Sequence, residues 1–140
     1  MKRGLFVTAL GVLSSAFLVA CSSGGAAPAG GAAPAAGAAT EVKVTAASGF
    51  KFTVPTTTYK AGQTYKFTVT NSDVLPHEFA VLPKGEMDHS KALAFVPDTD
   101  FGANKTVTKE VKFDKPGTYE IACHVPGHYE AGMHVEITVS

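Results

Sequence analysis

The chain has 140 residues, a length that suits one domain, and its formal net charge at pH 7 is +0. Twelve basic and twelve acidic side chains balance each other, and no basic patch favours binding to nucleic acid. The chain has only two cysteines, Cys21 and Cys123, whereas an exported domain usually uses cysteines in disulfide-bonded pairs.

Residues 1–20 are predicted to be a signal peptide. Lys2 and Arg3 precede an apolar stretch that is too short, and wrongly flanked, for a transmembrane span. The sequence LVA before Cys21 resembles the lipobox of bacterial lipoproteins, in which the cysteine is acylated and becomes the mature N-terminus. We therefore predict that Cys21 is lipidated. The alternative is a plain secretory signal, in which Cys21 has no special role.

Residues 21–40 contain the predicted lipidated cysteine and a flexible linker. From Ser22 to Thr40 the sequence has no charge and no large side chain. Such a segment buries too little apolar surface to offset its conformational entropy, so we expect a disordered tether. A lipid and a long tether predict a domain that moves but stays close to a membrane. The remaining residues, 41–140, form the predicted folded domain.

This domain is predicted to be all-β. The runs at residues 50–54, 64–70 and 106–113 alternate between apolar and polar residues, although Lys109 interrupts the last of them. The predicted inward side chains are Phe50, Phe52, Val54, Tyr65, Phe67, Val69, Val107, Val111 and Phe113. The one helical candidate is residues 88–95, with Asp88 as the N-cap. Several short strands separated by turns predict a small β-sandwich or barrel.

The same alternation predicts the direction of several unusual side chains at strand ends. His77 shares a face with Phe79, and Cys123 shares a face with Ile121. Met133 shares a face with the apolar residues of the last predicted strand. All three therefore point towards the core, while His128 lies in the loop between the cysteine and the methionine.

A thiolate, two imidazoles and a thioether are the ligands of copper in a trigonal His₂Cys site with a weak axial Met. Zinc is the competing metal, but it normally requires another firm ligand in place of Met. Each residue alone has a plain structural interpretation, since a single inward Cys is often a small buried apolar residue. The Cys-x₄-His-x₄-Met spacing and the agreement of the strand faces favour the copper site. We expect the other histidines, His89, His124 and His134, to be solvated surface residues.

The motifs PHEFAV and PGTYEIACHVPGHYEAGM resemble those of the cupredoxins, the blue-copper family, over residues 41–140. The Cys–His gap is closer to that of auracyanin and rusticyanin than to that of plastocyanin. The resemblance implies a Greek-key β-sandwich that binds one type 1 copper ion. It further implies that His77, Cys123 and His128 are equatorial ligands and that Met133 is the axial ligand.

The resemblance also implies that the backbone N–H of residue 78 donates to the Cys123 sulfur. Plastocyanins and azurins commonly have Asn at this position, where its side chain ties two loops together. Glu78 cannot donate such a bond when it is ionised, so the tie must be absent, altered or replaced. We hypothesise that a contact between Glu78 and His124 replaces it.

The predicted function is a membrane-tethered, exported electron carrier that cycles between Cu(II) and Cu(I) and is not an enzyme. We expect a monomer, lipid-anchored on the periplasmic or extracellular side of a bacterial membrane, that exchanges electrons with membrane-bound redox proteins. The predicted docking patch for these partners consists of Val125, Pro126, His128, Tyr129 and Ala131.

Two alternatives come from other functional classes. The first is a copper chaperone or copper-resistance protein, favoured by the proximity of Met87 and His89 and by a weak second site at His124 and His134. The second is a thiol enzyme that uses Cys123 with a nearby His. The enzyme alternative leaves Met133 unexplained and places the nucleophile inside the core.

Overall fold

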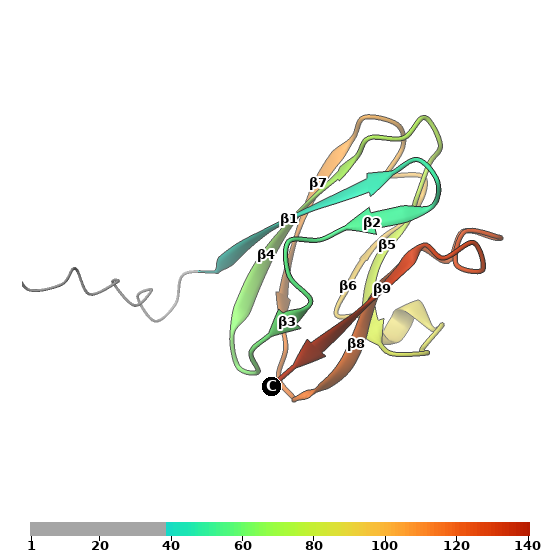
Figure 1. Cartoon of the computed structure of the whole chain (residues 1–140). Helices are drawn as coiled ribbons and strands as arrows, with labels where there is room; N and C mark the ends of the chain where they lie inside the picture. The colour runs from blue at the N-terminus through green and yellow to red at the C-terminus, as the bar shows by residue number, and fades with distance from the viewer. Residues whose placement is uncertain (1–38) are drawn as a thin grey trace, which may run out of the picture. The chain divides into compact units, whose positions relative to one another are not determined.

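The computed structural model describes residues 39–140, which form two β-sheets and one 3₁₀-helical turn (Figure 1). The predicted signal peptide, Cys21 and nearly all of the predicted linker lie outside the described residues. Within residues 39–140, no helix is long and apolar enough to cross a membrane. The elements are β1 (Thr40–Ala47), β2 (Lys51–Thr53), β3 (Thr58–Tyr59), β4 (Thr64–Asn71), β5 (Phe79–Pro83), η1 (His89–Lys91), β6 (Ala94–Val96), β7 (Thr106–Lys112), β8 (Gly117–Ala122) and β9 (His134–Val139).

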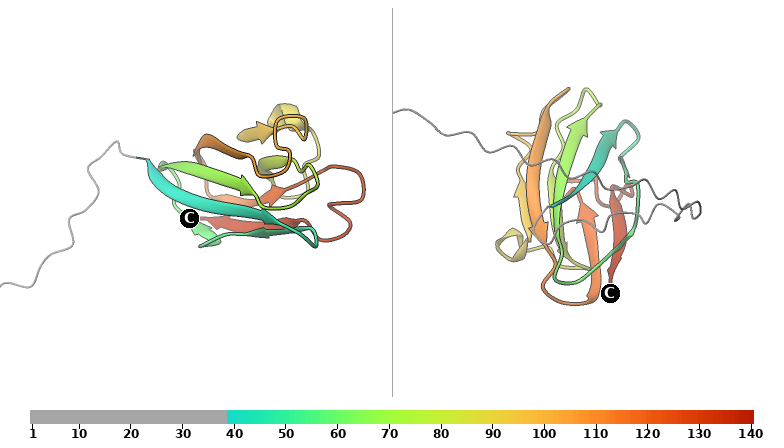
Figure 2. Two further views of the ribbon diagram at one scale, coloured as in Figure 1. Left: turned by 90° about the horizontal axis from the view of Figure 1, so that it is seen from above. Right: turned by 90° about the vertical axis from the view of Figure 1, so that its left-hand side faces the viewer.

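The two sheets pack face to face as a β-sandwich (Figure 2). One sheet has the strand order β2-β1-β4-β7 and the other has the order β3-β9-β8-β5-β6. Both sheets are mixed, because β1 pairs with β4 and β3 pairs with β9 in parallel, while the remaining pairs are antiparallel. The prediction of an all-β sandwich is confirmed.

Strand β4 shows how the sequence builds the core. Its alternation buries Tyr65, Phe67 and Val69 between the sheets and leaves Lys66 exposed to solvent. Burial of a side chain such as Phe67 stabilises the fold by about 1.5–3 kcal/mol relative to exposure. Strand β7 follows the weaker pattern that its sequence predicts, with Val111 buried and Val107 half-buried.

The predicted helix at residues 88–95 is much shorter in the structure. Only His89–Lys91 forms a 3₁₀ turn, and the Asp88 side chain caps it by accepting a hydrogen bond from the Ser90 N–H at 3.0 Å. The prediction is wrong for the residues that follow, since Ala94 and Phe95 belong to β6 and pair with β5. Tertiary pairing with a sheet edge outweighs the weak helical preference of this segment.

The outer face of the five-stranded sheet is also covered. Ala80, Leu82 and Ala122 are fully buried but lie outside the core cluster between the sheets. The connection between β5 and β6, which contains η1, lies over this face, where the His89 ring of η1 reaches His124. The connection rejoins the sheet edge where the Leu93 N–H donates to the Val81 carbonyl at 2.8 Å. Side chains that alternation turns away from the core are therefore not automatically exposed here.

Candidate metal centre

Three of the predicted ligands meet at one end of the sandwich. His77 comes from the segment between β4 and β5, Cys123 directly follows β8, and His128 lies in the loop between β8 and β9. The Nδ1 atoms of His77 and His128 are 3.2 Å apart, and the Cys123 Sγ lies 3.4 Å from the His128 Nδ1. His77 and Cys123 have no solvent exposure. The structure therefore brings a thiol and two imidazoles together, although they are up to 51 residues apart in the chain.

Met133 lies inside the same end of the core, as its strand face predicts. It is fully buried and belongs to the hydrophobic cluster that includes Cys123. The Cys123 N–H donates to the Met133 carbonyl at 3.0 Å, and the Met133 N–H donates to the His128 carbonyl at 3.0 Å. These bonds fix both ends of the loop and tie the backbone of Met133 to the other two loop residues.

A tight turn positions His128. Val125, Pro126 and Gly127 precede it, and the His128 N–H donates to the Val125 carbonyl at 2.9 Å. Gly127 has a φ of +85°, which a residue with a side chain rarely adopts. Proline followed by a glycine of positive φ is typical of a type II turn. The sequence VPGH therefore sets the direction in which the imidazole leaves the loop.

Asp73, which is not among the site residues predicted from the sequence, orients the other imidazole. Its Oδ2 lies 3.3 Å from the His77 Nε2, while its N–H donates to the Asn71 Oδ1 at 2.8 Å. A proton on Nε2 that is donated to Asp73 leaves the lone pair of Nδ1 facing Cys123 and His128. The motif NSD at the end of a strand, four residues before His77, is the signal that could have identified this carboxylate.

Burial favours the neutral forms of Cys123 and His128. Burial raises the pKa of the Cys123 thiol, and it lowers the pKa of the His128 imidazole. Burial also acts to raise the pKa of Asp73, but hydrogen bonds from the Val74 N–H and from His77 outweigh it and hold the pKa below its usual value. A cation is therefore needed to stabilise the thiolate, and neutral imidazoles suit a metal.

Glu78 connects the two loops in a way that differs from an asparagine. Its backbone N–H donates to the Cys123 Sγ at 3.2 Å, as the family resemblance implies. Its side chain accepts a hydrogen bond from the His124 N–H, at 3.2 Å from Oε1. The side chain of residue 78 therefore still links the two loops, but the Glu78 carboxylate accepts a hydrogen bond where an asparagine amide would donate one. The hypothesised contact between Glu78 and His124 is present.

The prediction that His124 is a surface residue is wrong. Its side chain is only 5% exposed, because the connection that carries His89 covers it. Burial lowers the pKa of His124, although the Glu78 carboxylate acts to raise it. His89 is 32% exposed and His134 is exposed, with its ring stacked on Tyr129 at 4.4 Å between centroids.

The sequence profile of the copper-binding proteins of the plastocyanin/azurin family matches residues 38–140. The protein is a cupredoxin of this family. The donor set that its fold brings together, one thiolate, two imidazoles and a buried thioether side chain, suits copper, the metal of this family. No curated protein matches the sequence significantly.

Solved structures of blue copper proteins share the fold of this cupredoxin. Dithionite-reduced auracyanin from Roseiflexus castenholzii and auracyanin A from Chloroflexus aurantiacus each have 21% sequence identity and a TM-score of 0.60. The similarity covers 74% of this chain in both cases, and 99% and 100% of the respective auracyanin chains. Rusticyanin from Thiobacillus ferrooxidans has 25% identity and a TM-score of 0.54, with 74% of this chain and 79% of that chain covered.

Proposed function

We propose that this cupredoxin carries single electrons, with one copper ion bound by His77, Cys123 and His128 and with Met133 as the axial ligand. The observation that carries the proposal is the convergence of three ligand atoms, all within 4.8 Å of one another, beside a buried methionine. Copper, when bound, would supply the one-electron chemistry of the Cu(II)/Cu(I) couple.

The protein's contribution is to hold the ligands still. Cys123 and Met133 flank the ends of paired strands, and their backbones are hydrogen-bonded to each other. His77 is fixed by Asp73, and the Glu78 N–H contacts the sulfur. Ligands fixed in this way rearrange little between the two copper oxidation states, which suits fast electron transfer.

The predicted docking patch has support from its partial exposure. Pro126 and Ala131 are exposed, whereas Val125, His128 and Tyr129 are half-buried. We propose that the electron leaves through the edge of His128, whose ring lies 4.7 Å from that of Phe50 between centroids. Apolar side chains make no ion pairs that must be broken, so such a patch suits brief docking with a redox protein.

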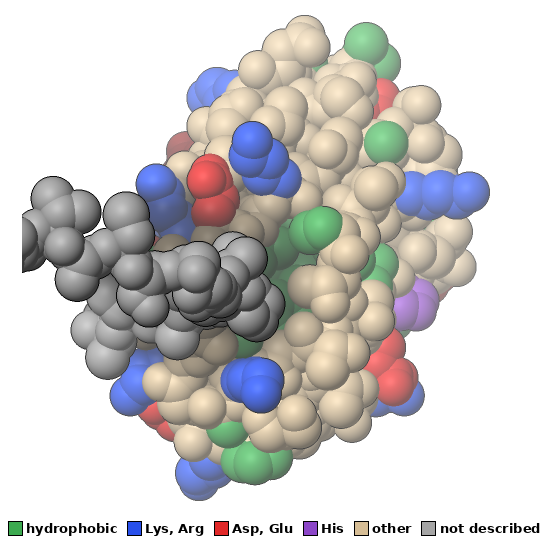
Figure 3. Space-filling view, turned by 60° about the vertical axis from the view of Figure 1, so that its left-hand side comes forward, with side chains coloured by type: hydrophobic (Ala, Val, Ile, Leu, Met, Phe, Trp, Pro, Cys, Tyr) green, Lys and Arg blue, Asp and Glu red, His purple; other side chains and the backbone are tan. Residues whose placement is uncertain are grey.

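We propose that three further apolar residues, Val74, Leu75 and Phe50, extend this docking patch. Val74 and Leu75, in the segment before His77, are 83% and 43% exposed. Phe50 has a left-handed φ of 56°, which is unfavourable for a bulky residue, and its ring contacts His128. On the face drawn in Figure 3, lysine and acidic side chains are interspersed, and hydrophobic side chains reach the surface at several places.

We further propose that Cys21 carries the lipid and that the linker tethers the domain to the periplasmic or extracellular side of a bacterial membrane. The basis is the signal-like sequence of residues 1–20 and the small residues before Cys21. A tether of this kind raises the effective concentration of the domain near membrane-bound donors and acceptors. Mass spectrometry of the mature protein tests this: an N-terminal Cys21 without acyl chains would refute it.

Visible absorption and EPR spectra of the Cu(II)-loaded protein test the copper site. We expect an intense blue thiolate-to-copper band with narrow copper hyperfine splitting, and the loss of both in Cys123→Ser. The matched control is His134→Ala, which removes an exposed histidine and should leave both spectra unchanged. A pale wild-type protein with an ordinary tetragonal spectrum would contradict the proposal and would place copper on other histidines.

Metal exchange separates an electron carrier from a copper chaperone. We expect the reduced protein to retain Cu(I) in the presence of a Cu(I) chelator and to exchange electrons reversibly with a redox mediator. Rapid release of Cu(I) to the chelator would favour the chaperone alternative. The thiol-enzyme alternative is disfavoured, because Cys123 is fully buried and burial raises its pKa.

A further inference from the structure

A second group of ligand atoms lies on the outer side of the five-stranded sheet. Glu78, His89 and His124 bring one carboxylate oxygen and two ring nitrogens within 4.8 Å of one another. The His89 Nε2 lies 2.8 Å from the Glu78 Oε1 and 2.9 Å from the His124 Nδ1. The His124 Nδ1 lies 3.6 Å from the same oxygen. We propose that these three residues bind a second metal ion, a divalent ion of the Zn²⁺ type.

The chain places this cluster directly behind the copper site. Glu78 follows His77 and His124 follows Cys123, and successive side chains of an extended segment point in opposite directions. The third residue, His89, comes from η1, which lies over the outer face of the sheet. The two clusters therefore share the same two backbone segments but have no ligand in common.

The separations of the three atoms suit a metal ion. Atoms at these distances lie on a circle of about 1.8 Å radius, slightly smaller than the about 2.0–2.2 Å that Zn²⁺ keeps from nitrogen and oxygen ligands. A tetrahedral ion with these bond lengths keeps its ligand atoms about 3.3–3.6 Å apart, so the His124–Glu78 separation already fits and the two hydrogen-bonded separations would open by about 0.5 Å on binding. Three protein ligands and one open position are typical of zinc sites with a His₂Glu set.

The ligands are held in place before any ion binds. The Glu78 side chain is 9% exposed, and its Oε1 also accepts the His124 N–H at 3.2 Å. The His89 ring stacks on Phe95 at 4.2 Å between centroids. The His124 Nε2 is buried and has no partner among the described residues, so the Nδ1 side is the polar side of this ring. His89, at 32% exposure, leaves a route from solvent.

The chemistry of the donors selects the class of ion. Two imidazoles and one carboxylate suit Zn²⁺ or Cu²⁺, whereas Ca²⁺ and Mg²⁺ prefer oxygen ligands alone. The cluster has no sulfur ligand, in contrast to the copper site with Cys123. A borderline ion such as Zn²⁺ is therefore the appropriate probe.

An ion at this position would act on the copper site, an effect that rests on the proposed electron-carrier function. The Glu78 N–H donates to the Cys123 Sγ, and His124 is the next residue in the chain. A positive charge placed behind the sulfur favours Cu(I) over Cu(II), so the reduction potential should rise. By linkage, the reduced protein should bind Zn²⁺ more tightly than the oxidised protein, by the same factor.

The test is a calorimetric titration of the copper-loaded protein with Zn²⁺. We expect one equivalent to bind to the wild type and the affinity to fall at least about tenfold in His89→Phe, which keeps an aromatic ring against Phe95 but removes the nitrogen ligand. The matched control is His134→Phe, which makes the same change in a histidine stacked on Tyr129. The control should bind Zn²⁺ as the wild type does.

The outcomes are distinct from those that test the copper site. Zn²⁺ binding that is absent in the wild type, or equal in His89→Phe, would overturn the proposal. A Zn²⁺-dependent rise in the reduction potential that is lost in His89→Phe would support it. If the blue copper site itself does not form, titration of the metal-free wild type and His89→Phe still tests the second site, because the affinity for one of the bound equivalents should fall at least about tenfold in the variant.

Discussion

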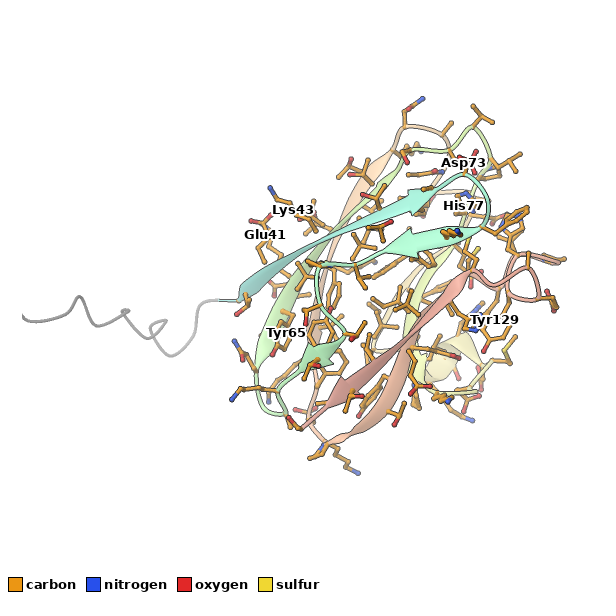
Figure 4. The ribbon with its side chains drawn as sticks, viewed as in Figure 1. Glu41, Lys43, Tyr65, Asp73, His77 and Tyr129 are labelled. Atoms are coloured by element: carbon orange, nitrogen blue, oxygen red, sulfur yellow. The ribbon has the colours of Figure 1, made fainter. Side chains whose placement is uncertain are left out.

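The two ends of the sandwich interior differ in polarity: one is built from aromatic side chains, and the other also contains buried polar side chains. At the end marked by Tyr65 in Figure 4, aromatic rings pack on one another: the Tyr59 ring lies 4.9 Å from that of Tyr65 and 5.5 Å from that of Phe113 between centroids. At the end marked by Asp73 and His77, the interior holds these two buried polar residues beside apolar ones such as Met133. One core thus joins an apolar end to a metal-binding end.

Burial raises the pKa of an acidic group at each end, but the neutral form that results has a different importance at the two ends. It raises the pKa of Tyr59 from 10.0 to about 12, and this phenol simply stays neutral. It also raises the pKa of Cys123, yet a thiolate is the form that binds a metal. The aromatic end therefore stabilises the fold, while the other end holds buried polar groups that are costly to bury and that a cation would stabilise.

The largest effect on stability is expected from removing an aromatic ring at the aromatic end. Phe113→Ala removes a fully buried ring and leaves a cavity, which should lower the free energy of unfolding by about 3–5 kcal/mol. Urea unfolding of the metal-free protein measures it, with the exposed Lys112→Ala as the control. The copper-loaded variant, kept cold enough to stay folded, should retain the blue spectrum. A changed spectrum would show that the two ends are not independent.

A smaller effect, on copper affinity, is expected from a substitution at the metal-binding end. Asp73→Asn should weaken copper binding by about 10–100-fold, because the amide nitrogen or the uncharged oxygen orients His77 less firmly than the carboxylate. Competition with a Cu(II) chelator measures the affinity, and the exposed Asp100→Asn provides the control. Equal affinities in the two variants would mean that Asp73 has no role in positioning His77.

The smallest effect on stability is expected from the buried hydroxyl group of Tyr59 at the aromatic end. Because its pKa is raised to about 12 in the folded protein, its stabilising contribution is complete below pH 10 and is lost as the pH rises through 12. Tyr59→Phe should therefore reduce the loss of stability between pH 7 and alkaline pH. At pH 7 the variant should lose about 0.5–1.5 kcal/mol with the hydrogen bond to the Thr56 carbonyl. Unfolding at both pH values checks this, and equal pH dependence in the two proteins would refute it.

The alternation of residues predicts the part of the site that lies on strands. Cys123 and Met133 flank β8 and β9, where a two-residue period fixes which side chains face the core, and both are buried as expected. His128 likewise lies in the loop between Cys123 and Met133, as the sequence predicts. Local patterns of this kind are sufficient because each depends only on neighbouring residues.

The rest of the site depends on contacts that no local pattern specifies. Asp73 approaches His77 only because the segment between β4 and β5 folds back, with the Asn71 side chain bonded to the Phe101 carbonyl at 3.1 Å. His124 was wrongly placed at the surface because alternation gives the face of a side chain but not what covers that face. The cover over His124 is a connection whose path is set by the pairing of β6 with β5.

The hydrogen bond between Cys123 and Met133 makes the loop between β8 and β9 a closed unit. Eleven contiguous residues, 123–133, contain three of the four proposed ligands, and their two ends meet at adjacent strands. The segment can therefore be treated as an exchangeable cassette. A loop of different length, grafted between the same two strands, would remodel the metal geometry while the scaffold beneath it kept its sheets, and natural divergence can follow the same route.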